Sequence, residues 1–163
     1  MVDVDYPNDP EEVRVFADVP ANLQRLRDGG FANVIITNQS GIGRGLITEA
    51  QYRAVHERLL ASLGANLITA TYYSPDVPGP NALRRKPLPA MVLEAARDLD
   101  LDLTRSWFIG DRGSDMECGR AAGVRPILVL TGKSGSNDHI AAVYVAKDFA
   151  SAAQFILENQ GAS

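Results

Sequence analysis

The 163-residue sequence has one cysteine, two histidines and no long hydrophobic run. The single cysteine, Cys118, excludes an internal disulfide and any metal site built from several cysteines. No apolar stretch approaches the roughly 20 residues that a helix needs to cross a bilayer. The first residues also lack the basic and apolar regions of a signal peptide. We therefore expect a soluble cytoplasmic protein that has no membrane partner.

Charge and composition narrow the range of partners further. The formal net charge is −4 and the isoelectric point is about 5.1, which argues against a nucleic-acid surface. Hydrophobic residues make up 45% and charged residues 22% of the chain, close to the average of globular proteins. No repeat or change in composition marks a boundary, so we predict a single domain over residues 1–163, as a monomer or weak homo-oligomer.

Short apolar runs alternate with longer amphipathic segments along the chain. The clearest run, residues 32–37, is β-branched and unbroken, as expected of a strand buried on both faces. Strands that alternate with helices indicate an α/β fold, with right-handed crossovers and helices on both faces of a parallel sheet. The predicted strands are 32–37, 67–73, 106–109, 126–130 and 142–145, and the predicted helices are 20–28, 48–63, 88–99, 114–122 and 151–159.

Ligands of such sheets bind at the carboxyl ends of the strands, so the residues there carry the functional argument. The first predicted strand ends in Thr37, followed by Asn38, Gln39, Ser40 and several glycines. The hydroxyl, the amide and the backbone N–H groups of this flexible, glycine-rich segment would form a binding site for a phosphoryl group. On this stretch alone, a polar turn explains the residues equally well.

The strand at 106–109 is followed by Asp111 and Asp115. Two carboxylates four residues apart, at the start of a helix, suit a hard divalent cation such as Mg²⁺. Taken alone, this stretch is explained at least as well by Asp111 or Ser114 capping the helix that follows.

A run of three cations, Arg84, Arg85 and Lys86, lies between these two polar groups. In an acidic protein such a run needs an anionic partner, and Lys86 would neutralise the charge of a phosphoryl group during its transfer. The alternative is a solvated basic loop, which is the usual fate of a charge run.

In this order the three groups resemble motifs two, three and four of the phosphatases of the haloacid-dehalogenase (HAD) superfamily. The stretches TNQSGIGRG, RRKPLPAM, SWFIGDRGSDMECGRAAGV and LVLTGK more narrowly resemble the D-glycero-D-manno-heptose 1,7-bisphosphate phosphatases and the related histidinol-phosphate phosphatases. The resemblance runs from Val2 to about Leu157. It implies a Rossmann-like HAD fold, three layers α/β/α with a mostly parallel sheet and no large cap domain.

The resemblance also implies an activity, namely Mg²⁺-dependent hydrolysis of a phosphate from a sugar phosphate. A heptose bisphosphate is the first candidate substrate and histidinol phosphate the second. Thr37 and Lys86 would stabilise the phosphoryl group, while Asp111 and Asp115 would hold Mg²⁺. The residues that the resemblance implies in substrate binding are Asp3, Tyr6, Asn38, Gln39, Ser40, Arg44, Arg85 and Arg112.

The chain departs from the family at its first motif, Asp-x-Asp-Gly, whose aspartates serve as nucleophile and as general acid and base. This motif does not occur in the sequence, and Asp3-Val4-Asp5 lacks both a preceding apolar strand and a following glycine. The family's first strand lies in mid-sheet, so its loss would leave backbone groups unpaired at about 1–3 kcal/mol each. We expect such a chain to be unstable, to close the gap in its sheet by a different arrangement of strands, or to have the missing strand supplied by another segment. A non-catalytic protein that binds phosphorylated metabolites remains an alternative.

A second departure concerns zinc. Heptose bisphosphate phosphatases often carry a cluster of cysteine and histidine just before the Arg-Lys-Pro motif, but residues 73–83 contain neither. Because a structural zinc site needs four such ligands, no zinc is expected. The three prolines of this loop would stiffen it instead.

Overall fold

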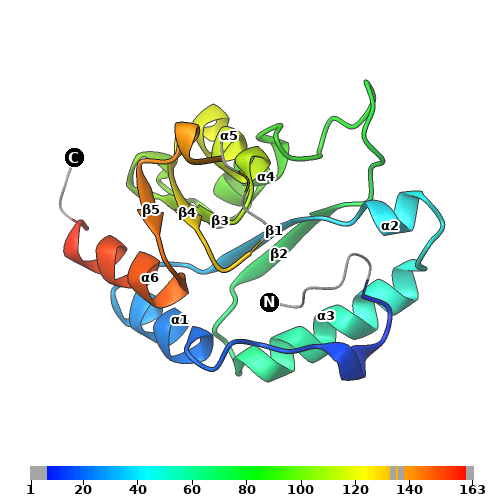
Figure 1. Ribbon diagram of the computed structural model, residues 1–163, viewed down its shortest axis with the longest axis horizontal. Coiled ribbons are helices and arrows are strands. Elements are labelled where there is room, and N and C mark those ends of the chain that lie inside the picture. Colours follow the sequence, from blue (N-terminus) through cyan, green and yellow to red (C-terminus); the bar gives the residue numbers. More distant parts are fainter. Residues whose placement is uncertain (1–6, 133–134, 136–137, 161–163) are drawn as a thin grey trace. The chain divides into compact units, whose positions relative to one another are not determined.

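The computed structural model describes residues 7–132, 135 and 138–160. The chain divides into two compact units, Met1–Leu83 and Arg84–Ser163, and each unit has its own parallel sheet (Figure 1). Both units alternate strands with helices, which confirms the predicted α/β class. The single domain over residues 1–163 stays a prediction.

Among its described residues, the first unit is built around a parallel sheet of two strands. Strands β1 (Val34–Asn38) and β2 (Ala70–Ser74) pair in a register that sets Thr37 beside Tyr73 and Asn38 beside Ser74. The carboxyl ends of both strands therefore lie at the same edge. The remaining elements of the unit are η1 (Pro10–Glu12), α1 (Val19–Asp28), α2 (Ser40–Gly43) and α3 (Glu49–Leu63).

Helix α3 begins and ends where the sequence predicts. The Thr48 side chain accepts a hydrogen bond from the Gln51 backbone at 3.2 Å, and the Gln51 side chain accepts one from the Thr48 backbone at 2.9 Å. This reciprocal capping box satisfies two backbone donors at the helix start. At the other end Gly64 has a φ of 114°, which stops the helix because other residues rarely adopt that conformation.

The burial of β1 differs from the prediction. All five residues of the strand have intermediate exposure, whereas the unbroken apolar run predicts burial on both faces. The prediction was wrong because, within the described residues of this unit, β1 pairs with β2 alone, so a strand covers only one of its sides.

The second unit contains a three-stranded parallel sheet in the order β3-β4-β5. Helix α4 begins two residues later than predicted, because Pro89 occupies its N-cap. The elements of the unit are α4 (Ala90–Leu99), η2 (Leu103–Arg105), β3 (Trp107–Gly110), α5 (Gly113–Ala122), β4 (Arg125–Val129), η3 (Asp138–Ala141), β5 (Tyr144–Ala146) and α6 (Phe149–Glu158).

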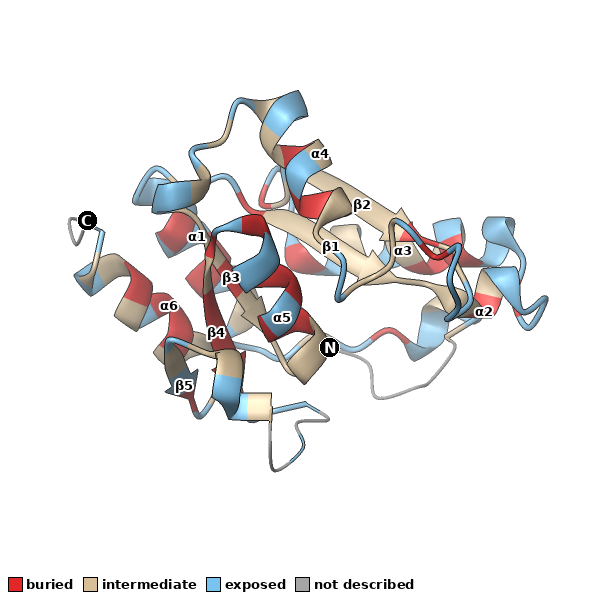
Figure 2. Cartoon of the chain, turned by 90° about the horizontal axis from the view of Figure 1, so that it is seen from above, coloured by how far each residue is buried: buried red, intermediate tan, exposed pale blue. Residues whose placement is uncertain are grey.

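Helices α5 and α6 cover opposite faces of this sheet. Gly119 of α5 approaches Phe108 and Pro126 so closely that an added Cβ would lie 3.1 and 3.2 Å from their Cβ atoms. On the other face, Phe155 of α6 stacks on Tyr144 with ring centroids 3.9 Å apart. The central strand β4 is accordingly buried along most of its length (Figure 2). This unit thus has the predicted three layers, α/β/α.

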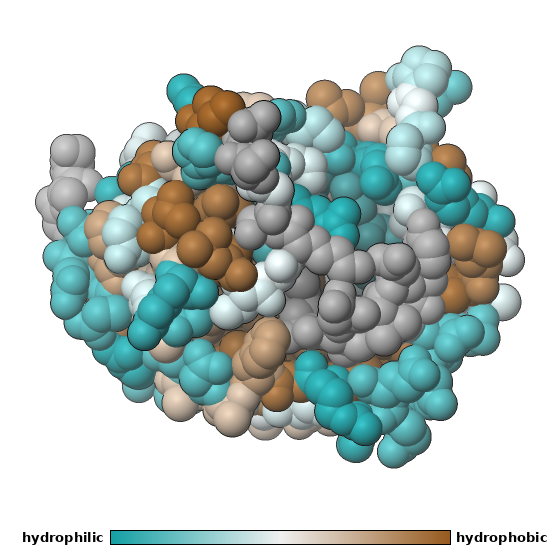
Figure 3. Space-filling model, viewed as in Figure 1, coloured by the Kyte–Doolittle hydropathy of each residue, from teal (hydrophilic) through white to brown (hydrophobic). Residues whose placement is uncertain are grey.

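Exposed apolar side chains gather where β5 forms the edge of the sheet. Figure 3 shows hydrophobic surface over the part of the molecule that holds β4 and β5. The most exposed of the large apolar residues in this region are Leu130, Ile140, Val143 and Val145.

None of the described helices combines the length and hydrophobicity that a membrane span requires.

Candidate functional site

The acidic loop predicted to bind a metal lies at the carboxyl end of β3. Strand β3 ends at Gly110 and helix α5 begins at Gly113, with Arg112 as an extended N-cap that makes no side-chain cap hydrogen bond. Neither Asp111 nor Ser114 is the N-cap, so the interpretation of these residues as helix caps was wrong. Helix capping therefore does not account for the half-buried carboxylate of Asp111.

Asp115 forms a nearly buried ion pair with Lys86. The Nζ of Lys86 lies 2.7 Å from Oδ1 of Asp115, and the two side chains are 13% and 7% exposed. The second oxygen, Oδ2, accepts a hydrogen bond from the backbone N–H of Asp111 at 3.2 Å. Asp115 thereby ties Lys86 to the loop that carries Asp111, and its position in the first turn of α5 favours a negative charge.

Two glycines allow these carboxylates to lie close to the backbone. A Cβ on Gly110 would overlap the Cβ of Asp115, and a Cβ on Gly132 would overlap Oδ2 of Asp111. Gly132 follows β4, the strand that pairs with β3, so both glycines lie at the carboxyl edge of this sheet. Only a residue without a side chain leaves the Asp111 carboxylate in its present place.

The surroundings of Lys86 are partly apolar. Its Nζ lies 5.7 Å from the centroid of the Phe108 ring. Nearby, Sγ of Cys118 donates to the carbonyl oxygen of Leu88 at 3.4 Å. Burial raises the pKa of the Cys118 thiol to about 11, which leaves it protonated and inert at neutral pH. Cys118 is thus a structural residue.

The two aspartates fit Mg²⁺. Among the described residues no group of three or more His, Cys, Asp and Glu side chains could hold a metal ion. Mg²⁺ is usually bound by one or two carboxylates, with waters and phosphate oxygens completing the shell. Asp111 lies on the loop after β3 and Asp115 lies in the first turn of α5. The backbone N–H of Asp111 donates to Asp115, and the carboxylate of Asp111 lies against the Gly132 backbone. This donor set suits Mg²⁺ and does not suit a four-ligand zinc site.

The first unit places Thr37 at the carboxyl end of β1. Nε2 of Gln39 donates to Oγ1 of Thr37 at 3.1 Å, which leaves the hydroxyl hydrogen of Thr37 as a donor. The backbone N–H of Gln39 donates to the carbonyl of Ser74 at 2.7 Å, extending the β1–β2 ladder by one bond. Gln39 is thereby fixed, and it orients the threonine hydroxyl.

The glycine-rich loop after Thr37 uses part of its hydrogen-bonding capacity on itself. The N–H of Ile42 donates to the carbonyl of Gln39 at 3.1 Å, and that of Gly45 donates to Ile42 at 2.9 Å. A Cβ on Gly43 would overlap the carbonyl oxygen of Pro75, so this glycine permits close contact with the loop after β2. These contacts hold α2 and the residues after it against the loop that follows β2.

The predicted site residues differ in how well the structure places them. Lys86, Asp111 and Asp115 come together in the second unit, and Thr37 and Gln39 come together in the first. Arg85, Asn38 and Ser40 are half-buried, whereas Arg44 and Arg112 are exposed. Asp3 and Tyr6 lie outside the described residues.

Sequence reasoning missed two contacts of this site. The first joins Gly132 to Asp111, although Gly132 belongs to the LVLTGK stretch that carried part of the resemblance. The second joins Arg84 to Glu94, ten residues further on. Arg84 lies before helix α4, so no helical spacing rule links it to Glu94.

The known proteins that this chain resembles agree with one another in family. Residues 83–152 match the family model of HAD-hydrolase-like proteins. The chain is 35% identical to the D-glycero-beta-D-manno-heptose-1,7-bisphosphate 7-phosphatase of Yersinia pestis, over 81% of this chain and 76% of that protein. It is 34% identical to the enzyme of that name from Mesorhizobium japonicum, over 82% of this chain. In that case the match spans 65% of the relative, slightly under two thirds of its length.

A solved structure agrees with the sequence matches. The D,D-heptose 1,7-bisphosphate phosphatase of B. bronchiseptica, crystallised with magnesium and phosphate, superposes with a TM-score of 0.84. The two chains are 30% identical, and the match covers 96% of this chain and 92% of that one.

Proposed function

Since the chain belongs to the HAD-like hydrolases, and within them to the family of heptose-1,7-bisphosphate 7-phosphatases, we propose that it releases phosphate from a small phosphorylated sugar in the cytoplasm. D-glycero-D-manno-heptose 1,7-bisphosphate is the first candidate substrate and histidinol phosphate the second. The magnesium and phosphate bound by the B. bronchiseptica relative support a Mg²⁺-dependent reaction at a phosphoryl group.

The observation that carries the proposal is the buried pair of Lys86 and Asp115 beside Asp111. In the proposed reaction the Lys86 ammonium neutralises charge on the phosphoryl group, and Asp115 fixes the direction of that ammonium. Asp111 would hold Mg²⁺ through its carboxylate, and Asp115 would complete the metal-binding segment. When bound, Mg²⁺ neutralises charge on the phosphoryl oxygens and helps to align them.

The other predicted site residues have proposed roles in phosphate binding. In the proposal Thr37 donates its hydroxyl hydrogen, which the contact from Gln39 leaves available. Asn38 and Ser40 bind the same group, while Arg44, Arg85 and Arg112 bind the rest of an anionic substrate. Arginine suits that role because its planar fork pairs with phosphate in two places.

The covalent step requires an aspartate nucleophile. Its carboxylate oxygen forms a bond to phosphorus while the ester bond breaks, the sugar oxygen takes a proton, and water then hydrolyses the aspartyl-phosphate. The sequence contains no Asp-x-Asp-Gly, and Asp3 and Asp5 lie outside the described residues.

The test measures Mg²⁺-dependent phosphate release from a panel of sugar phosphates that includes heptose 1,7-bisphosphate and histidinol phosphate. Two proteins are compared, the 163-residue chain and a version extended at its N-terminus by the upstream codons. Activity in the extended protein alone assigns the nucleophile to the added residues. Activity in the 163-residue chain assigns it to Asp3 or Asp5, which Asp3→Asn and Asp5→Asn would separate. Silence from both proteins contradicts the phosphatase function.

A binding protein for phosphorylated metabolites, which would hold them through Thr37, Lys86 and Asp111, is the second candidate. It predicts that vanadate and orthophosphate bind in the presence of Mg²⁺ without any turnover. The Lys86→Ala variant should lose this binding in either case, so turnover alone distinguishes the two functions.

A further inference from the structure

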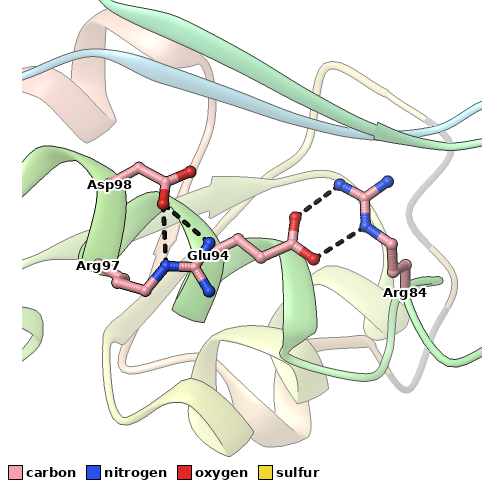
Figure 4. A network of polar contacts seen from close by, with 4 residues as sticks. All are labelled: Arg84, Glu94, Arg97 and Asp98. Carbon is pink, nitrogen blue, oxygen red and sulfur yellow. Dashed lines mark hydrogen bonds and ion pairs between the residues drawn. The ribbon is translucent and has the colours of Figure 1, made fainter.

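Arg84 and Glu94 form a bidentate ion pair inside the second unit (Figure 4). Nε of Arg84 donates to Oε1 of Glu94 at 2.9 Å, and Nη2 donates to Oε2 at 2.6 Å. A guanidinium fork that faces a carboxylate in this way fixes direction as well as distance. The side chains are 43% and 28% exposed, so the pair acts as a geometric restraint more than as a source of stability.

The ion pair closes a short stretch of chain on itself. Glu94 lies in the second turn of α4, whereas Arg84 lies before the helix begins. Between them the chain turns back, and the N–H of Leu88 donates to the carbonyl of Arg85 at 2.9 Å. Lys86 lies inside this closed stretch, two residues from Arg84.

A second set of contacts holds the same stretch to α5. Nζ of Lys86 lies 2.7 Å from Asp115, and the carbonyl of Leu88 accepts from Cys118 at 3.4 Å. The stretch is therefore fixed to α4 at its start and to α5 in its middle. Two fixed points leave the backbone of Lys86 little freedom, and release of either one would let its ammonium move.

A restraint on the chain around Lys86 accounts for the Arg84–Glu94 pair better than substrate binding or a solvated surface contact does. If Arg84 served chiefly to bind substrate, its guanidinium would not donate two hydrogen bonds, from Nε and Nη2, to the carboxylate of Glu94. If the pair were only a solvated surface contact, it would resemble that of Arg97 and Asp98 on the same helix. That pair joins adjacent residues at 2.8 Å and is 74% and 42% exposed (Figure 4).

We propose, building on the phosphatase function above, that Arg84 and Glu94 are positioning residues whose ion pair sets where Lys86 presents its ammonium to the phosphoryl group. They act through Lys86 and do not contact the reacting atoms. A displacement of about 1 Å at a catalytic group can lower a rate by as much as roughly a hundredfold, so a restraint of this kind is visible in turnover.

The experiment compares Glu94→Gln and Arg84→Lys with the matched control Asp98→Asn, in the active form of the protein. Glu94→Gln should lower kcat about tenfold and change KM by less than about twofold, because the ammonium is misplaced while binding is retained. Arg84→Lys keeps the positive charge but loses the bidentate contact of the guanidinium with Glu94, so its kcat should fall between those of Glu94→Gln and the wild type. Asp98→Asn should match the wild type.

Dependence on Lys86 is tested in a Lys86→Ala background, where adding Glu94→Gln should lower kcat no further. A further fall by the same factor in that background would overturn the positioning role. So would equal kcat values for Glu94→Gln and Asp98→Asn.

A measurement without turnover separates this inference from the proposed function. Hydrogen exchange at the Leu88 amide should become about tenfold faster in Glu94→Gln and stay unchanged in Asp98→Asn. The absence of phosphate release from both the 163-residue chain and its extended form contradicts the phosphatase function. A Leu88 amide that exchanges equally in both variants contradicts the positioning role, whatever the activity.

Discussion

Lys86 Nζ lies 2.7 Å from Oδ1 of Asp115, and this contact joins the segment before α4 to the first turn of α5. Both side chains are nearly buried, so the two charges lose much of their hydration. Their mutual attraction offsets that loss only when the geometry of the pair is good. Such a pair contributes little net stability, yet the loss of one partner is costly. Its value to a phosphatase lies in an ammonium that points in one direction.

Replacing Lys86 by methionine should lower the free energy of unfolding by about 3 kcal/mol, because the buried carboxylate of Asp115 then lacks its ammonium. The second change Asp115→Asn removes that charge and should recover part of the loss. Urea denaturation at pH 7 measures both effects.

The control for this variant is Arg53→Met, which breaks the exposed pair of Arg53 and Glu49 on α3. That change should cost less than about 1 kcal/mol. Similar losses in Lys86→Met and Arg53→Met would show that the Lys86 pair behaves as a surface contact.

Gly132→Ala should weaken Mg²⁺ binding, because the new Cβ would overlap Oδ2 of Asp111 and displace the carboxylate. The Mg²⁺ concentration for half-maximal phosphate release should rise about tenfold, as for changes to groups that orient a metal ligand. Gly79→Ala is the control, since the nearest atom to its Cβ is 4.0 Å away. An unchanged Mg²⁺ requirement in Gly132→Ala would count against Asp111 as the ligand.

Cys118 should react with thiol reagents only when the protein unfolds. Its side chain is fully buried, and burial raises the pKa of the thiol to about 11. At pH 8 only about one thiol in a thousand would be ionised, and that fraction would still be covered by the fold. A urea series with an aromatic disulfide reagent should show labelling that follows unfolding, and because Cys118 is the one cysteine of the sequence the signal is unambiguous. Rapid labelling without urea would contradict its structural role.

Chelation with EDTA should abolish phosphate release and leave the melting temperature nearly unchanged. Asp111 and Asp115 suit a Mg²⁺ that comes and goes with substrate, and residues 73–83 carry no cysteine or histidine for a structural zinc. Added Mg²⁺ should restore activity, whereas Zn²⁺ should not. A fall of many degrees in the melting temperature on chelation would reveal a structural metal.

The ion pair of Arg84 and Glu94 should respond to acid in a defined direction. The hydrogen bond from Arg84 holds the pKa of the Glu94 carboxyl below its ordinary value of 4.5. A lowered folded-state pKa contributes stability above pH 4.5, and that stability is lost as the pH falls through the folded-state value. The difference in unfolding free energy between wild type and Glu94→Gln should therefore shrink below pH 4.5. A constant difference down to pH 3 would contradict the assignment of this pKa.

Many features of the chain followed from local sequence alone. Every predicted strand and helix is present, because short β-branched runs, Thr48 as a cap and Gly64 as a stop act within a few residues of themselves. The order of Thr37, Lys86 and Asp111 likewise indicated the phosphatase family, since a motif is a property of the chain. The burial of β1 could not be predicted in this way, because it depends on how many strands pair beside it.

Tertiary structure alone decided how the charged side chains are paired. The sequence places Arg84, Arg85 and Lys86 side by side, and only the fold pairs Arg84 with Glu94 and Lys86 with Asp115. It likewise decided that Gly132 lies against Asp111. These three contacts join residues that are not neighbours in the chain, and the strength of an ion pair depends on distance and burial, which no local pattern encodes. The sequence by itself determined which elements form and which family they belong to, and the packing of those elements determined which charges meet.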